Sequence, residues 1–389
     1  MSRMIGTLLL GAIAMFGLAS CGDDAASQAE TANTESAAAG PQVLNVYNWS
    51  DYIAEDTIRN FEAKTGIKVN YSLYSNNDVL EQGLAATPDA YDVIFPSAQP
   101  HAQRMIAAGA LAPLDKKRLG NLKHIDPAIL AELGGIDTGN AHIVPYMWGT
   151  TGLGINVEKA RTALGADAAL DSWNLLFDPA SASKLSACGI GVLDNELESF
   201  TAALIWKGRD PNDFSAEANA VVHDIYGAIR PHIRKFGNDS EMIDGLANGE
   251  LCLVLSFSGD VQQAQARAQE IADAAKSKAP TIRYVIPREG AMRWTDVIGI
   301  PKNAKHVENA HRFLQYLMEP EVIAGISNHV AYANANTSAT PLLDKAIAED
   351  PGIYPPAAVR AKLSTARQPT EAEAAQRKQA WTNIIYGQM

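Results

Sequence analysis

Short apolar segments alternate with segments of helical period over the first part of the chain that can form a core. Strand-like segments lie at residues 43–47, 67–73 and 91–95, and helical segments lie at residues 55–64, 77–86 and 99–108. Gly66 follows the first helical segment, as expected at a helix end. Strands that alternate with helices pair in parallel and carry helices on both faces of the sheet. The pattern therefore predicts an α/β fold in which ligands bind at the carboxyl ends of the strands.

A second series of elements follows a glycine-interrupted apolar strand at residues 143–155. We expect a helix over 157–164, a strand at 190–193, helices up to 248, strands at 283–286 and 296–300, and an amphipathic helix over 306–318. Two α/β groups joined by crossing strands describe a two-lobed fold whose cleft closes on ligand by hinge motion. We expect one lobe to contain residues 42–148 and about 294–340, and the other to contain residues 149–293 and about 341–389.

Composition restricts the kind of ligand. The 389 residues are 47% hydrophobic and 20% charged, which is typical of a folded globular protein. The formal net charge of −12 argues against a nucleic-acid partner and favours encounters with cationic ligands. No oligomerisation signal is visible in the sequence, so a monomer is expected.

The N-terminal region has the features of an export signal. Arg3 precedes an apolar run over residues 4–16 that is shorter than the ~20 residues of a membrane-spanning helix. Residues 18–21 (Leu-Ala-Ser-Cys) are similar to the bacterial lipobox, which predicts a signal peptide at 1–20 and lipidation of Cys21; plain signal cleavage is the alternative. Residues 21–41 are small and polar and are expected to form a flexible tether.

Cysteine usage agrees with export. If Cys21 carries lipid, Cys188 and Cys252 remain as an even pair in an oxidising compartment. We therefore expect a disulfide between these two residues. Two buried free thiols remain the alternative, because two cysteines alone do not exclude them.

The loop after the first strand combines two aromatic rings, a hydroxyl group and a carboxylate in four residues, Trp49, Ser50, Asp51 and Tyr52. A carboxylate binds an ammonium group through charge-assisted hydrogen bonds, and aromatic faces attract cations. Ser97 follows the third predicted strand and falls on the same edge of the sheet. The pattern fits an organic cation, but the same residue types also occur at a core rim or in a solvated turn.

Five motifs in order resemble the substrate-binding proteins of ABC-type polyamine importers, the putrescine-binding branch most of all. They are YNWSDYI at residues 47–53, VPYMW at 144–148, GD at 259–260, EGAM at 289–292 and YANAN at 332–336. The similarity extends from about Val43 to the region of Trp381. Cys188 and Cys252 also match the disulfide pair of that branch.

The resemblance implies a two-lobed, type II-like periplasmic binding protein fold with the ligand cleft between the lobes. It implies polyamine binding in the periplasm, delivery to an ABC permease in the inner membrane, and no cofactor. The positions that match the family's ligand site are Trp49, Ser50, Asp51, Tyr52, Ser97, Glu198, Phe257, Asp260, Trp294, Asp296 and Tyr332. Glu198 and Asp296 are expected on opposite lobes, where each would hold one ammonium end of a diamine.

Several pocket residues differ from those of the putrescine-binding branch, and these differences bear on which amine is bound. Phe257 stands where that branch usually has Trp, and Trp294 stands where it has Phe, as in spermidine binders. The pair Ser50 and Asp51 is putrescine-like, since spermidine binders tend to have Thr and Glu there. Other differing pocket positions are Gln99, Asn195 and Ala366. Putrescine is therefore the expected ligand, with spermidine, cadaverine and agmatine as alternatives.

Rival functions find less support. The sequence contains no nucleophile elbow, phosphate-binding loop or His-Glu-x-x-His helix, so we do not expect an enzyme. His306 and His311 are five residues apart, off the spacing of a helical metal site, and we expect both at the surface. A polyamine sensor that presents its ligand to a membrane signalling receptor remains an alternative, because the cleft would be the same.

Overall fold

The computed structural model describes residues 42–388. The predicted signal peptide (1–20), the lipidation site Cys21 and the tether (21–41) lie outside the described residues and stay predictions. Within the described range, no helix combines the length and hydropathy that crossing a membrane requires.

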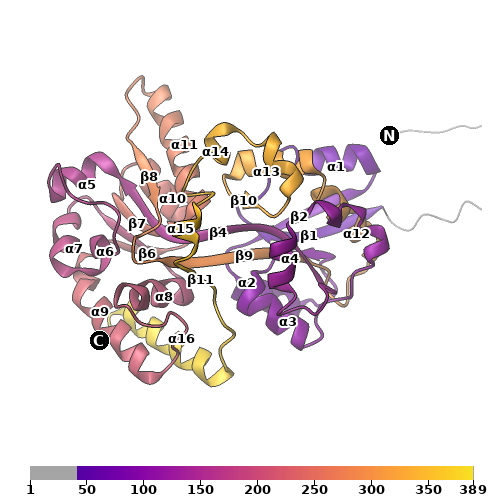
Figure 1. Ribbon diagram of the computed structural model, residues 1–389, viewed down its shortest axis with the longest axis horizontal. Helices are drawn as coiled ribbons and strands as arrows, with labels where there is room; N and C mark the ends of the chain where they lie inside the picture. The colour runs from indigo at the N-terminus through magenta and orange to yellow at the C-terminus, as the bar shows by residue number, and fades with distance from the viewer. Residues whose placement is uncertain (1–41, 389) are drawn as a thin grey trace, which may run out of the picture. The chain divides into compact units, whose positions relative to one another are not determined.

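Eleven strands in the described range join in one sheet (Figure 1). They are β1 (Val43–Trp49), β2 (Lys68–Tyr74), β3 (Val93–Ile94), β4 (Ile143–Asn156), β5 (Ile190–Leu193), β6 (Lys235–Gly237), β7 (Leu253–Phe257), β8 (Ile282–Val285), β9 (Ala291–Gly299), β10 (Ala333–Asn334) and β11 (Leu363–Ser364). Neighbouring strands follow the order β2-β1-β3-β9-β4-β7-β5-β6, while β8 and β10 pair with β4 and β11 pairs with β9. The late strand β9 therefore lies beside β4 in the middle of the sheet.

Helices connect the strands and cover the sheet (Figure 1). The α-helices are α1 (Thr57–Thr65), α2 (Asn77–Ala86), α3 (Gln103–Ala107), α4 (Pro127–Leu133), α5 (Val157–Leu164), α6 (Asn174–Phe177), α7 (Pro179–Leu185), α8 (Glu196–Trp206), α9 (Ala216–Ile229), α10 (Asp239–Ala247), α11 (Ser258–Ala274), α12 (Val307–Leu317), α13 (Pro320–Val330), α14 (Lys345–Ala348), α15 (Ala357–Arg360) and α16 (Glu371–Tyr386). Other helical turns lie at Ala98–Ala102, Lys116–Arg118, Gly120–His124, Arg230–His232 and Thr337–Leu342.

The N-terminal pattern of strands and helices folds as predicted. β1 pairs in parallel with both β2 and β3, and α1 and α2 form the connections. Gly66 ends α1 with φ 73°, a left-handed conformation that glycine adopts without a Cβ clash. At the start of α2 the side chain of Asn76 accepts a hydrogen bond from the backbone N–H of Val79. The carboxyl ends of β1 and β3 consequently meet at one edge of the sheet.

Strands β4 and β9 run through both halves of the molecule (Figure 1). All 14 residues of β4 are buried. β4 pairs antiparallel with β9 from Ile143 to Thr151 and with β7 from Thr151 to Ile155. Its Val144 packs in one apolar core and its Leu153 in another. The two strands thus join two lobes, each of which has its own core.

Large buried side chains define the two cores. Phe61 and Phe313 belong to the first core, and Trp173 and Phe200 belong to the second; none of the four is exposed to solvent. Helix α16 completes the second core through Trp381. Removing this much apolar surface from water is the main stabilising term of each lobe.

Several predicted elements are displaced by one or two residues at an end, and three others differ for reasons that their neighbours explain. β3 contains only two residues of the predicted strand 91–95. Asp92 does not continue the strand, because its buried carboxylate accepts a hydrogen bond from the backbone N–H of Asn45. The helix expected from Gln99 begins at Gln103, since Gln99 is extended (φ −122°) and precedes Pro100, which disfavours helical conformation before it. β9 begins five residues earlier than expected. The prediction missed this part of the strand because residues 293–295 are half-exposed and lack the apolar run of a buried strand.

The two histidines expected at the surface are structural instead. His311 is 3% exposed, and its Nε2 accepts a hydrogen bond from the backbone N–H of Asp115. His306 is partly buried, with its Nδ1 2.9 Å from Oδ2 of Asp92. The surface prediction was wrong because both side chains tie α12 to loops that are remote in sequence.

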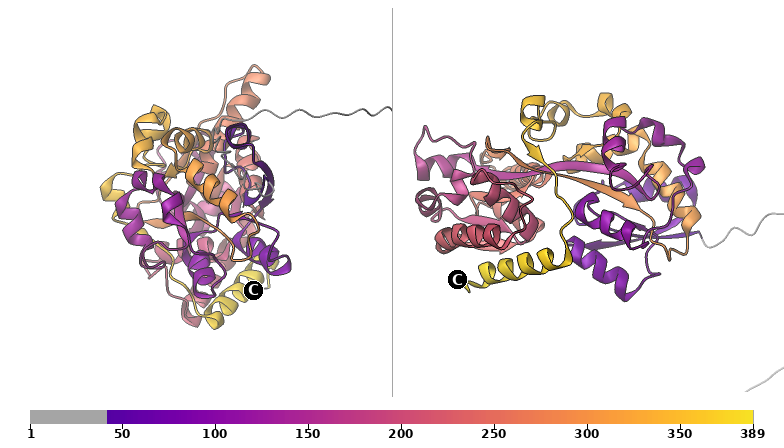
Figure 2. Two further views of the ribbon diagram at one scale, coloured as in Figure 1. Left: turned by 90° about the vertical axis from the view of Figure 1, so that its right-hand side faces the viewer. Right: turned by 60° about the horizontal axis from the view of Figure 1, so that its bottom comes forward.

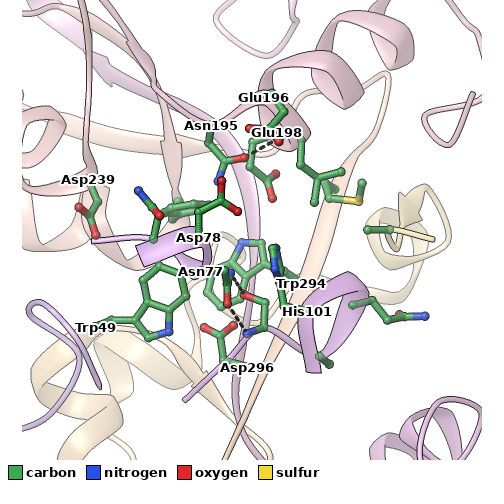
Figure 3. Close-up of a pocket in the computed structure, with 18 of the residues that line it drawn as sticks. Trp49, Asn77, Asp78, His101, Asn195, Glu196, Glu198, Asp239, Trp294 and Asp296 are labelled. Atoms are coloured by element: carbon green, nitrogen blue, oxygen red, sulfur yellow. Dashed lines mark hydrogen bonds between the residues drawn. The ribbon is translucent and has the colours of Figure 1, made fainter. Parts of the chain in front are cut away.

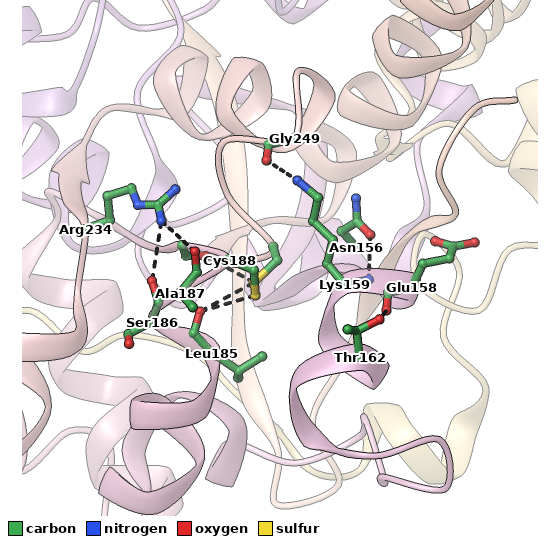
Figure 4. The surroundings of a disulfide bond; sticks show 12 residues. Asn156, Glu158, Lys159, Thr162, Leu185, Ser186, Ala187, Cys188, Arg234 and Gly249 are labelled. Carbon is green, nitrogen blue, oxygen red and sulfur yellow. Dashed lines mark hydrogen bonds between the residues drawn. A yellow bond between two sulfur atoms is a disulfide. The ribbon is translucent and has the colours of Figure 1, made fainter. Parts of the chain in front are cut away.

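The predicted disulfide is present between Cys188 and Cys252 (Figure 4). It joins the turn after α7 to the residue before β7, with a Cα–Cα distance of 5.5 Å. Nearby, the guanidinium of Arg234 donates a hydrogen bond to the carbonyl oxygen of Ala187 at 3.0 Å. The bond closes a loop of 64 residues within the second lobe, which restricts the unfolded chain.

Candidate functional site

A cavity of about 360 Å³ is lined by residues from both lobes (Figure 3). All the residues predicted to contact the ligand line it: Trp49, Ser50, Asp51, Tyr52, Ser97, Glu198, Phe257, Asp260, Trp294, Asp296 and Tyr332. The differing pocket positions Gln99, Asn195 and Ala366 line it too. The fold therefore gathers residues that are more than 300 positions apart in the sequence into one cavity.

The first loop is held in place by hydrogen bonds to neighbouring strands. The indole N–H of Trp49 donates to the carbonyl oxygen of Phe95 at 2.7 Å, which fixes the ring beside the end of β3. The Tyr52 hydroxyl donates to Oδ2 of Asp296 at 2.9 Å. The Tyr52 ring also packs edge to face with Tyr332, at a centroid distance of 5.3 Å. The loop thus contributes one aromatic wall and orients an acid on β9.

Asp296 lies in the middle of the crossing strand β9 and is 5% exposed. Oδ2 accepts the hydrogen bond from Tyr52, whereas Oδ1 is buried without a hydrogen-bond partner. Burial raises the pKa of Asp296 to about 7, because the surrounding protein solvates the carboxylate less well than water does. One oxygen of this acid is therefore available to a ligand.

Glu198 approaches the cavity from the other lobe, in the first turn of α8. The side chain of Asn195 caps this helix and accepts a hydrogen bond from the Glu198 backbone N–H at 3.3 Å. Glu198 is 5% exposed, and its Oε2 has no hydrogen-bond partner. Burial raises its pKa to about 7, and the negative charge of Asp296 acts in the same direction.

Asp260 is the third buried acid and lies in the first turn of α11. Its Oδ1 accepts a hydrogen bond of 2.6 Å from the Tyr332 hydroxyl, and its Oδ2 is buried without a partner. Burial and the nearby carboxylate of Asp239 raise the pKa of Asp260 well above its ordinary value. Three buried carboxyl groups thus each retain one unpartnered oxygen, an arrangement that is costly without a countercharge.

Aromatic rings line the cavity beside the acids. Trp294 packs edge to face against Phe257 at 5.5 Å and against Tyr332 at 5.3 Å between ring centroids. The Trp294 indole N–H is buried without a hydrogen-bond partner. Ring faces attract ammonium groups and cover methylene groups, so the walls and the acids suit the same ligand.

Comparison with known proteins identifies the family to which a chain with such a cavity belongs. Residues 56–355 match the family of bacterial extracellular solute-binding proteins. The chain belongs to this family. It is 43% identical to the putrescine-binding periplasmic protein PotF of Escherichia coli (strain K12), over 90% of this chain and 93% of the relative. It is 42% identical to the putrescine-binding periplasmic protein SpuD of Pseudomonas aeruginosa (strain UCBPP-PA14), over 90% of this chain and 94% of the relative.

A solved structure supports the same relationship. The putative spermidine/putrescine ABC transporter from Listeria monocytogenes superposes with a TM-score of 0.76 at 28% identity, covering 88% of this chain and 98% of the other. These matches confirm the two-lobed fold, and they confirm that the chain is a solute-binding protein rather than an enzyme.

Asp51 occupies a different position from the three buried acids in this solute-binding protein. Its carboxylate lies 3.3 Å from the guanidinium of Arg267 on α11, and it accepts a hydrogen bond of 3.4 Å from the Ser240 hydroxyl on α10. Its side chain is 40% exposed. Asp51 therefore joins the two lobes at the rim of the cavity.

Sequence reasoning missed a residue that positions Ser97. The Asn77 side chain donates to the Ser97 hydroxyl and accepts from the Ser97 backbone N–H, each at 3.1 Å. Asn77 also lines the cavity. The available signal was an asparagine in the first turn of α2, directly after the strand edge at which ligands bind.

Two glycines were also missed as parts of the site. A Cβ atom on Gly149 would lie 2.5 Å from the Trp294 ring, and a Cβ on Gly259 would lie 2.5 Å from the Tyr332 ring. Both distances are too short for any side chain. These glycines let the rings pack against the backbone. For Gly149 the requirement appears only after β4 and β9 are paired, and for Gly259 it appears only after the start of α11 packs against Tyr332.

We expect Gly149→Ala to push the Trp294 ring into the cavity and to weaken amine binding about tenfold, because relieving such a clash costs about 1–3 kcal/mol. Titration calorimetry with putrescine measures the change. Gly325→Ala is the matched control, since nothing lies within 4 Å of a Cβ there. Unchanged affinity in Gly149→Ala would show that the ring does not contact the ligand.

Proposed function

We propose that this protein binds putrescine in the periplasm and delivers it to an ABC permease. One observation carries the proposal: Glu198, Asp260 and Asp296, from both lobes, surround one cavity and each presents a buried oxygen that has no partner. A dication supplies the countercharge that such a set requires. The proposal is supported by the names of the two relatives that match nine tenths of the chain.

The roles of the site residues follow from their positions. Glu198 and Asp296 hold the two ammonium ends, and Asp260 adds a second acid from the lobe of Glu198. Trp49, Tyr52, Phe257, Trp294 and Tyr332 cover the methylene chain, while Ser50, Ser97 and Asp51 complete the rim. Each cation–π contact in such a desolvated site contributes about 2 kcal/mol.

Closure and attachment complete the proposal. One lobe consists of residues 42–148 and about 294–340, the other of residues 149–293 and about 341–389, and β4 and β9 bend between them when ligand enters. Lipid on Cys21 and the tether at 21–41 keep a monomer close to a membrane surface.

Isothermal titration calorimetry of the ligand-stripped protein against putrescine, cadaverine, spermidine and agmatine tests the proposal. We expect one-to-one binding, tightest for putrescine. Tighter binding of spermidine would mean that the ligand is a different polyamine, and it would identify Trp294 and Phe257 as the residues that determine the ligand preference. Absence of heat with every amine would overturn polyamine binding.

Transport and sensing are separated by a second measurement. Membranes that contain the permease encoded nearest to this protein should take up labelled putrescine only when the protein is added. Uptake that is independent of the protein, together with binding to a signalling receptor, would favour the sensor.

A further inference from the structure

Helix α16 carries a lysine from the second lobe to the first. Trp381 and Ile384 bury the helix in the second core. Lys378, one turn earlier, directs its ammonium toward the first lobe, where it lies 2.5 Å from Oδ2 of Asp78 in α2. Figure 2 shows the N-terminal end of α16 reaching the first lobe. Lys378 and Asp78 both line the ligand cavity.

This ion pair lies at the rim of the cavity, where the Lys378 and Asp78 side chains are 60% and 46% exposed. Glu196 and Glu198 share the first turn of α8, and both line the cavity (Figure 3). Glu196 also attracts the Lys378 ammonium electrostatically. A ligand ammonium that reached this part of the rim would therefore meet Glu196, Asp78 and Lys378.

The charges at this rim distinguish diamines from triamines. A diamine places one ammonium at Glu198 and the other at Asp296, so it leaves the rim unused. A triamine has a further ammonium, which Glu196 and Asp78 would attract if they were free. Lys378 already provides a cation to both acids, and its own charge repels another.

We propose that Lys378 is a specificity-determining residue whose ammonium occupies the place of a triamine's third ammonium, so that the cleft favours diamines. The inference rests on the proposed function, since it names which amines the same site accepts. It adds a residue outside the predicted ligand set.

The test compares the affinities for putrescine and spermidine in Lys378→Gln. We expect spermidine to bind about fivefold tighter than to the unaltered protein, with putrescine changing less than about twofold, as partly exposed ion pairs allow. Lys378→Arg keeps the cation and should keep the original ratio. The double variant Lys378→Gln with Asp78→Asn should lose most of the gain, because the acid that was freed is gone.

Lys64→Gln is the matched control for net charge, because Lys64 has similar exposure and pairs with Glu319 at 2.6 Å away from the cavity. An equal gain for both amines, or the same ratio change in Lys64→Gln, would overturn the inference and leave putrescine binding standing. If the unaltered protein bound neither amine, the proposed function would fall and the inference with it.

Discussion

Replacing Asp296 by Asn, or Glu198 by Gln, is expected to weaken putrescine binding by about 100-fold or more, because each change leaves a buried ammonium without its countercharge at a cost of about 3 kcal/mol. The amides keep the shapes of the acids and remove only the charge. Calorimetry with putrescine measures the loss. Retained affinity in both variants would exclude these residues as the ammonium ligands.

The same substitutions should stabilise the ligand-free protein. At pH 8 the unpartnered carboxylates of Glu198 and Asp296 are buried as charged groups, which lowers the free energy of unfolding. Replacing them by neutral amides removes this cost. Asp137→Asn is the matched control, since Asp137 is also buried but accepts hydrogen bonds from the backbone N–H groups of His142 and Ile143. It should lower the free energy of unfolding and leave putrescine affinity unchanged.

Putrescine affinity should fall steeply as the pH is lowered. The pKa values of Glu198 and Asp296 are both about 7 without ligand, whereas alkyl ammonium groups stay charged far above this pH. Binding then requires the release of protons from both acids. Between pH 8 and pH 6 we expect the affinity to fall about 100-fold, and calorimetry in buffers of different ionisation enthalpy should detect the protons released.

The stability of the ligand-free protein should change in the opposite direction. Because burial raises the pKa of both acids above their unfolded values, protonation favours the folded state. This contribution, about 4 kcal/mol per acid, is complete below the unfolded pKa values and is lost as the pH rises through about 7. Urea unfolding between pH 5 and pH 8 measures it. A flat profile for both stability and affinity would contradict the assignment.

Local sequence patterns were sufficient for much of the fold. The bounds of α2, α5 and β5 agree with prediction, because helix caps and apolar periodicity act over a few residues. The early start of β9 and the structural role of His311 were not predicted, since they depend on strand pairing and on loops that are distant in sequence.

The sequence by itself determined which residue types could bind a cation. The loop at Trp49 to Tyr52 showed this from its own chemistry, and the resemblance supplied Glu198 and Asp296. Only the tertiary structure decided which acids keep a free oxygen: Asp51 pairs with Arg267 at the rim, whereas Glu198 and Asp296 are buried with an oxygen unpartnered. Burial and pairing are set by neighbours from other elements, and it is these that determine the charge and pKa of a carboxyl group.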